Sequence, residues 1–330
     1  MKLKLNRDKK YLLACSFGPD SMALFYLLLQ EKYDFDVAIV NYHLRKESNR
    51  EVSGLENYAN LYNIKLHILD VKTPITSNIE ANCRQIRYQY FKSLFDEYGY
   101  DALLVAHQRD DIIETYLLQK NRQNLPKFYG IAEKSTILGM EVLRPLLSYS
   151  KKDLENICLD NNVPYAIDLT NLSNVFKRNK IRNQIVKNMS DIEKEKMLKE
   201  IESKNHELES IFQVIKHADL HDLRTLIYFD EITYLYAINE MVQSVDSSIN
   251  ISKVQGLEIL KALGSDKSNI VIKIRKKIYL YKEYDRVHVS VDEQNSGFCY
   301  LIERPQEFDC PYFYLDFRKD ASNRNVHLDD

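Results

Sequence analysis

What this sequence lacks excludes several classes of protein. No apolar run among its 330 residues approaches the roughly 18 that cross a bilayer, so no membrane partner is expected. The five cysteines are scattered and form no Cys-x-x-Cys pair, which favours reduced thiols over a disulfide framework, a zinc site or an iron–sulfur cluster. There is no tryptophan, no internal repeat and no low-complexity tract. Because the N-terminal residues also lack the apolar core of a signal peptide, we expect a cytoplasmic protein.

The length and the pattern of apolar residues predict an α/β protein. Hydrophobic residues make up 45% of the chain, which is enough for packed cores, and the length corresponds to about two domains. Short apolar segments predict strands at residues 11–15, 37–40, 65–69 and 102–106. Helical patterns alternate with them at residues 21–30, 50–62, 81–98, 111–120 and 151–161. This alternation indicates βαβ units and a parallel, Rossmann-like sheet.

The second half of the chain has a different pattern. A charged helical segment predicts a linker over 191–220, which separates a first domain, 1–190, from a second, 221–330. The second domain begins with helical patterns and then alternates as strands do over 270–291. We predict two strands there, joined by Lys282-Glu283-Tyr284-Asp285, and therefore a smaller α+β domain.

A turn separates the first predicted strand from the first predicted helix, and its sequence is Ser16-Phe17-Gly18-Pro19-Asp20-Ser21. A helix that begins at such a turn presents unpaired backbone N–H groups and the positive end of its dipole, which favour an anion such as phosphate. The turn lacks the Gly-Lys-Ser/Thr ending of the common P-loop, so no lysine is placed there to hold the terminal phosphates. The turn therefore indicates a use of ATP that differs from that of the common P-loop enzymes. The alternative is a purely structural turn between a strand and a helix.

A cluster of carboxylates follows the predicted strand at 102–106. Asp110 and Glu114 lie four residues apart and share one helix face, as do His107 and Asp111. At the carboxyl ends of parallel strands, such a cluster can hold Mg²⁺ or an amine. Taken alone, it is also an ordinary acidic first turn that complements the helix dipole.

Two further segments carry basic side chains. Glu80, Arg84 and Arg87 share one helix face, although Glu80 and Arg84 also have the spacing of a simple surface ion pair. Between residues 169 and 190 there are five basic side chains and no acidic one, on a chain of net charge −2. These five are Lys177, Arg178, Lys180, Arg182 and Lys187.

Taken in order, these motifs resemble those of the tRNA(Ile)-lysidine synthetase family, in the PP-loop ATP pyrophosphatase superfamily. The resemblance covers residues 10–190 and rests on the segments 16–21, 41–45, 80–88, 107–115, 144–147, 168–171 and 178–182. Two positions depart from the family pattern. Phe17 stands where the family has glycine, and Tyr42 stands where it has histidine.

The resemblance implies that residues 1–190 form a PP-loop ATP-binding catalytic domain that splits ATP between its α and β phosphates. It implies ATP binding by Ser16, Phe17, Gly18, Pro19, Asp20 and Ser21. Arg84 is the candidate for the α-phosphate, and Asp20 with Asp111 for Mg²⁺. The candidate catalytic residues are Asp20, Arg84, His107, Asp110 and Asp111. His107 is a candidate base, with helix capping or packing as the alternative.

The resemblance also implies a reaction, in which free L-lysine is joined to C2 of the wobble cytidine of tRNA(Ile) with a CAU anticodon. The cytidine is first adenylated, and the product lysidine changes codon reading from AUG to AUA. Glu80, Asp110 and Glu114 are the candidates for holding lysine. The candidates for tRNA contact are Arg45, Lys177, Arg178, Lys180 and Arg182, with the second domain gripping the stem through Lys273, Arg275, Lys276 and Lys277. A homodimer is among the oligomeric states that the sequence allows.

Two other functions stay open at this point. One is another PP-loop enzyme, such as a tRNA thiolase or an amidating synthetase; the missing cysteine pairs argue against the thiolase. The other is a nucleotide-binding module without turnover. Such a module would tolerate loss of Arg84, Asp110, Asp111 and Glu114, all of which are present.

Overall fold

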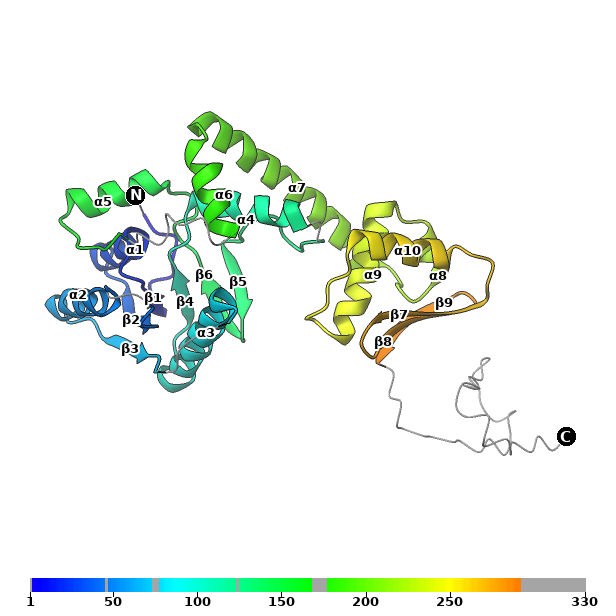
Figure 1. Ribbon diagram of the computed structural model, residues 1–330, viewed down its shortest axis with the longest axis horizontal. Helices are drawn as coiled ribbons and strands as arrows, with labels where there is room; N and C mark the ends of the chain where they lie inside the picture. Colours follow the sequence, from blue (N-terminus) through cyan, green and yellow to red (C-terminus); the bar gives the residue numbers. More distant parts are fainter. Residues whose placement is uncertain (1, 45–46, 73–76, 123–124, 168–176, 292–330) are drawn as a thin grey trace.

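A computed structural model describes residues 2–44, 47–72, 77–122, 125–167 and 177–291 (Figure 1). The chain forms two parts, and the long helix α7 (Asp191–His217) runs from one to the other. A six-stranded sheet is the centre of the first part, and a three-stranded sheet lies in the second. No helix within these ranges is both long and apolar enough to span a membrane.

The first part is a mostly parallel sheet with helices on both faces. Its strands are β1 (Lys10–Ala14), β2 (Asp34–Asn41), β3 (Leu66–Asp70), β4 (Ala102–Val105), β5 (Lys134–Ile137) and β6 (Met140–Leu143). Its helices are α1 (Pro19–Gln30), α2 (Ser48–Leu61), α3 (Ile79–Tyr98), α4 (Arg109–Arg122), α5 (Lys151–Asp160) and α6 (Lys177–Gln184). The strand order is β3-β2-β1-β4-β6-β5, and β5 alone runs antiparallel to its neighbour. The predicted α/β class is confirmed, while the hairpin of β5 and β6 was not predicted.

Alternation along the strands builds a core on each face of the sheet. Leu12 and Leu13 are both fully buried but point to opposite faces, as successive residues of a strand must. Leu13 packs in a core with residues of α1, α2 and α5, such as Phe25. Leu12 packs in another core with Phe91 and its neighbours on α3. The central strands are therefore held rigidly between two layers of helices.

The central position of β1 is what places the functional site. The chain runs from β1 outward to β2 and β3, then crosses back to β4 on the other side of β1. The register pairs Ala14 with Val105, so the segments that follow β1 and β4 begin side by side. An open sheet with such a reversal leaves a crevice at these strand ends, where ligands bind.

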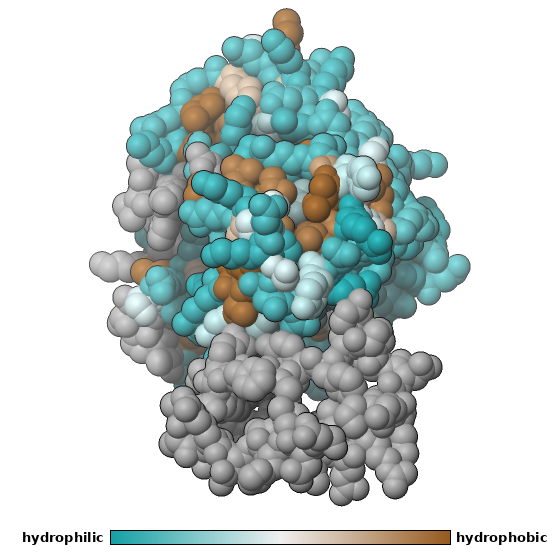
Figure 2. Space-filling view, turned by 90° about the vertical axis from the view of Figure 1, so that its right-hand side faces the viewer, coloured by the Kyte–Doolittle hydropathy of each residue, from teal (hydrophilic) through white to brown (hydrophobic). Residues whose placement is uncertain are grey.

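The second part contains α8 (Leu223–Ile227), α9 (Glu231–Val245), α10 (Lys253–Leu263), β7 (Asn269–Arg275), β8 (Ile278–Glu283) and β9 (Arg286–Val291). Its core joins α9 and α10 to one face of the sheet and to the end of α7. We predicted two strands here, whereas the structure has three, so the number was wrong. Lys276 takes a left-handed conformation (φ 46°) between β7 and β8, so the chain reverses without the glycine that signals a turn. Figure 2 shows this end of the molecule as mostly hydrophilic, with separate hydrophobic groups among the polar ones.

The backbone of Gly130 lies close against α4. Gly130 has a left-handed φ of 75°, and a Cβ placed on it would lie 2.6 Å from the Cγ2 of Ile112 in α4. Gly139, in the turn of β5 and β6, has a similar φ of 79° with no heavy atom within 4 Å of that point. The two glycines therefore share the conformational requirement and differ in the contact.

We expect Gly139→Ala to cost about 1 kcal/mol of unfolding free energy, from backbone strain alone. Gly130→Ala should cost a further ~2 kcal/mol, because its methyl group overpacks against Ile112. Urea unfolding of both variants measures the difference. Equal losses would show that the contact with Ile112 does not hold α4.

Candidate functional site

A cavity of about 350 Å³ lies at the carboxyl ends of β1 and β4. Its wall is formed by the turn after β1, by one face of α3 and by the first residues after β4. Lys151 of α5 and Arg182 of α6 close two further sides. The cavity therefore lies where the strand order reverses, which is the expected place for a ligand in an open α/β sheet.

The turn after β1 presents the start of α1 to this cavity. Gly18 is the N-cap and provides no side-chain cap, so the first amides of the helix are not capped from within the turn. Ser21 ties the turn together, because its hydroxyl accepts from the Ser16 N–H at 3.2 Å and donates to the Gly18 carbonyl at 3.0 Å. Helix amides exposed in this way are a binding site for phosphate.

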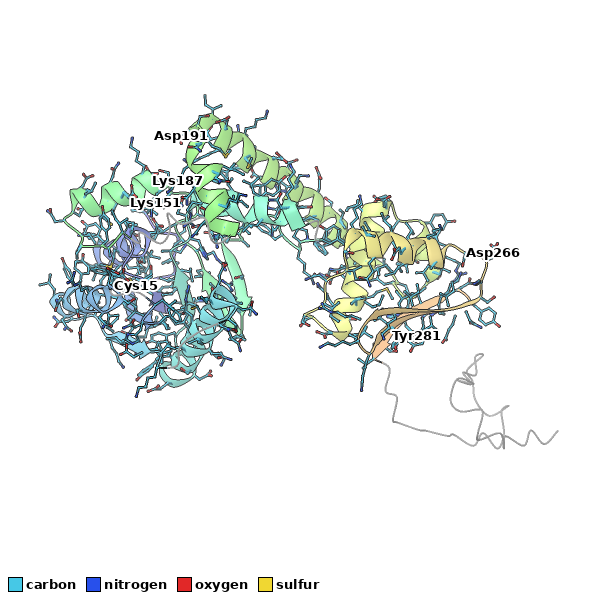
Figure 3. All side chains as sticks on the ribbon, viewed as in Figure 1. Cys15, Lys151, Lys187, Asp191, Asp266 and Tyr281 are labelled. Atoms are coloured by element: carbon cyan, nitrogen blue, oxygen red, sulfur yellow. The ribbon has the colours of Figure 1, made fainter. Side chains whose placement is uncertain are left out.

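Asp20 is the acidic group of the turn, and it is paired with a lysine from a distant helix. Lys151 is the first residue of α5 and is labelled in Figure 3. Its ammonium donates to Asp20 Oδ1 at 2.7 Å. Burial raises the pKa of Asp20, and the positive charge of Lys151 opposes that rise. The pair brings a cation to the edge of the cavity, although the turn itself contains none.

Arg84 and Arg87 reach the cavity from α3, each beside an aromatic ring. The Arg84 guanidinium lies 4.7 Å from the ring centre of Tyr88. Arg87 donates from Nε to the Tyr42 hydroxyl at 3.2 Å, and that hydroxyl donates to the Cys83 carbonyl at 2.7 Å. Both cations are thus held in place at the wall of the cavity, where they can meet an anionic ligand.

His107 lines the cavity as a neutral ring. Burial lowers the pKa of His107 to about 4, because the charged imidazolium loses its hydration there. Arg144 donates from Nε to His107 Nδ1 at 3.2 Å. Since arginine can only donate, the neutral ring carries its proton on Nε2. His107 therefore offers a hydrogen-bond donor, and its basic nitrogen is already occupied.

Two arginines of α6 clamp two carboxylates of α4. Arg178 donates to Asp111 Oδ1 and Glu114 Oε2, both at 3.0 Å. Arg182 donates to Glu114 at 2.5 and 2.9 Å and to Asp111 at 3.2 Å. Glu114 is only 1% exposed, so its charge must be balanced inside the protein, and the arginines do this. The ion pairs also attach α6 to α4.

Asp110 faces a third helix. Lys194 of α7 donates to Asp110 Oδ2 at 2.9 Å, and both side chains are largely buried, at 13% and 14% exposure. Arg109 also donates, at 3.1 Å, to the exposed carboxylate of Asp191, the first residue of α7. The start of α4 therefore holds the start of the long helix that leads to the second part.

The remaining predicted residues lie in different surroundings. Glu80 is exposed in the first turn of α3, and Lys180 is exposed on α6. Pro19 lines the cavity, whereas the side chain of Phe17 is buried toward α2. Arg45 lies outside the described residues, and so does the side chain of Lys177.

Comparison with known proteins places this site in a family. The profile of the PP-loop domain matches residues 2–189. The tRNA(Ile)-lysidine synthase of Mycoplasma mycoides subsp. mycoides SC is 31% identical over 86% of this chain and 74% of its own length. The chain belongs to the tRNA(Ile)-lysidine synthase family. The family resemblance inferred from the sequence is thereby confirmed.

Two other relatives carry the same name. The tRNA(Ile)-lysidine synthase of Ureaplasma parvum serovar 3 is 31% identical over 87% of this chain and 86% of its own length. That of Mesomycoplasma hyopneumoniae is 37% identical, and this match spans 55% of this chain and 61% of the relative. The similarity thus reaches beyond the PP-loop domain in two of the three relatives.

Several side chains that contact the predicted site residues of this lysidine synthase family member were not predicted from the sequence. Lys151 and Lys194 lie 131 and 84 residues from the aspartates that they pair with, so no local spacing reveals them. Arg144 was seen as part of a motif, but its contact with His107 was not. Arg87 was placed on the right helix face, while its link to Tyr42 depends on how β2 and α3 pack.

Because folding lowers the pKa of His107, protonation opposes the folded state. Above pH 6.5 the ring is neutral in both states and contributes nothing to the pH dependence. Between pH 6.5 and about 4 only the unfolded chain gains the proton, so we expect stability to fall as pH falls.

The His107→Gln variant keeps an acceptor for Arg144 but cannot titrate in this range. We expect the wild-type chain to lose about 2 kcal/mol relative to this variant between pH 7 and pH 4.5 in denaturant unfolding. Parallel stability curves over that range would contradict a buried neutral His107.

Proposed function

We propose that this chain joins free L-lysine to C2 of the wobble cytidine of tRNA(Ile) with a CAU anticodon, and converts ATP to AMP and pyrophosphate. The family match over most of the chain carries the proposal. The cavity supports it, because the turn after β1, three arginines and a neutral histidine surround one space at the strand ends. Such a space fits a nucleotide whose phosphates meet the start of α1.

ATP supplies the activation that this substitution needs. The C2 oxygen of cytidine attacks the α-phosphorus, and the bond from that phosphorus to pyrophosphate breaks. The amides at the start of α1 bind the departing pyrophosphate. Arg84 stabilises the charge that develops on the α-phosphate, and the Nε2–H of His107 donates to an oxygen in the same space. The ε-ammonium of lysine then loses a proton to solvent, and the neutral ε-amine attacks C2 and expels AMP, which carries the former C2 oxygen; the second proton of the new C–N bond also goes to solvent.

Asp20 fits Mg²⁺ better than Asp111 does, because the oxygens of Asp111 already accept from Arg178, Arg182 and the N–H of Gln108. Among the residues that the structure describes, no three His, Cys, Asp or Glu side chains form a metal cluster. Mg²⁺ commonly uses one or two carboxylates together with substrate phosphates, and Asp20 lines the cavity beside the turn. Bound there, the ion would offset the charge of the departing pyrophosphate.

For the lysine substrate, we propose Glu80 as the main contact of the ammonium group. Glu80 is exposed on α3, one helical turn before Arg84. Asp110 and Glu114 instead face Lys194 and the α6 arginines, so a substrate ammonium would have to displace a protein cation from them.

For tRNA, we propose that contact is mainly electrostatic. Lys180 and Lys187 are exposed near the α6 end of the first part, and Arg45 and Lys177 stay predicted contacts. The second part, with Lys273 on β7, would grip the tRNA away from the reacting base. Arg178 and Arg182 also stay predicted tRNA contacts. Each side chain is 29% exposed, and that exposed part would meet the tRNA.

The direct test is transfer of radiolabelled lysine to a tRNA(Ile) transcript carrying CAU, with ATP and Mg²⁺ present. We expect incorporation that needs ATP, and none with a matched transcript in which the wobble cytidine is replaced by uridine. ATP cleavage to AMP without lysine transfer would contradict the proposal and favour another acceptor for the activated phosphate.

The lysine contact is tested by neutralising one carboxylate at a time. Glu80→Gln should raise the KM for lysine at least about tenfold, because a charge-assisted hydrogen bond is lost, and should leave the ATP affinity unchanged. Glu97→Gln, at an exposed position near the other end of α3, is the matched control. Asp110→Asn should instead lower the unfolding free energy by about 2 kcal/mol, since Lys194 loses its counter-charge.

The opposite pattern would overturn the assignment. If Asp110→Asn raised the KM for lysine while Glu80→Gln left it unchanged, the ammonium would bind at α4 in place of Lys194.

A further inference from the structure

Two residues near the cavity each break a local rule. Phe17 has a φ of 57°, a left-handed conformation that costs free energy for any residue with a Cβ. Gly54 lies in the interior of α2, where glycine is the poorest helix former apart from proline. These two residues meet in space.

The ring of Phe17 rests directly on Gly54. A Cβ placed on Gly54 would lie 2.5 Å from Cζ and 2.8 Å from Cε1 of that ring, closer than such contacts ever come. The position therefore has no room for any other residue while the ring stays there. Phe17 is only 7% exposed, in a core shared with Leu55 and Tyr58 of the same helix.

The ring points away from the cavity while its neighbours line it. Ser16 and Gly18 both line the cavity on either side of Phe17. The backbone of Phe17 is held from a second direction, since its carbonyl accepts from the N–H of Ala166 at 2.8 Å. Burying the ring under α2 thus turns the backbone of the loop toward the ligand space.

We propose that Phe17, seated on Gly54, is a positioning residue that sets the conformation of the phosphate-binding turn. A side chain buried outside the cavity holds the backbone at a positive φ that would otherwise call for glycine. The contact also joins the turn to α2, which lines the same cavity through Glu51 one helical turn earlier. The inference rests on the proposed function only in taking ATP as the ligand of the turn.

The test measures binding of Mg²⁺–ATP to the full-length chain by isothermal titration calorimetry, without lysine or tRNA. We expect Gly54→Ala to weaken ATP binding at least tenfold, because the new methyl group displaces the ring and the turn with it. Ser53→Ala, at the exposed neighbouring position of α2, should change the affinity less than twofold. Circular dichroism of each variant shows whether the fold is retained.

The decisive result is the double variant. In a Phe17→Gly background there is no ring to displace, so adding Gly54→Ala should change the ATP affinity less than twofold. An equal loss in both backgrounds, or no loss from Gly54→Ala alone, would overturn the inference.

A second variant covers the case in which Gly54→Ala folds poorly. Phe17→Leu withdraws the side chain from Gly54 but keeps it apolar, and should weaken ATP binding three- to tenfold with the helix content unchanged. An unchanged ATP affinity in Phe17→Leu would overturn the positioning role. In lysine-transfer assays the same variant should raise the KM for ATP and leave the KM for lysine within twofold.

The ATP-binding measurements on these variants test the role of Phe17 separately from the proposed lysine-transfer reaction. A wild-type chain that binds ATP but transfers no lysine contradicts the proposed reaction and leaves the coupling of Phe17 with Gly54 as measured. Absence of coupling contradicts the positioning role even if lysine transfer proceeds.

Discussion

The parallel pairing of β1 with β4 is the constraint on which the site depends. It places the turn after β1 and the start of α4 at one edge of the sheet, although they are some ninety residues apart in the chain. Helices on both faces bury these strands, so the edge is a fixed frame. Every group of the cavity is attached to that frame, directly in the case of Ser16 and His107 and through packed helices in the case of Arg84 and Lys151.

The parts of the fold that follow from local patterns were predicted well, and the exceptions have physical causes. Apolar segments between helical patterns predicted β1 to β4 and most helices within a few residues of their bounds. The β5–β6 hairpin was missed because its four-residue strands are too short to establish alternation. The strand break at Lys276 was missed because a lysine there adopts the left-handed conformation typical of glycine.

Motifs identified the residues that gather at the site but not their partners. Asp111 and Glu114 were predicted from helix spacing, and Arg178 and Arg182 from a basic stripe, as two separate features. The structure shows them as one ion-pair network, which pattern alone could not reveal because the pairing depends on how α6 packs on α4. The role of Phe17 likewise becomes visible only when Gly54 is seen beneath its ring.

We propose that this cavity activates a cytidine oxygen with the α-phosphate of ATP. The most direct measurement omits lysine, supplies ATP labelled at the α-phosphate together with tRNA(Ile) carrying CAU, and asks where the label goes. We expect labelled AMP to be joined to the wobble nucleotide and released when lysine is added, and we expect no transfer from ATP labelled at the γ-phosphate. Formation of ADP, or label that never reaches the tRNA, would contradict it.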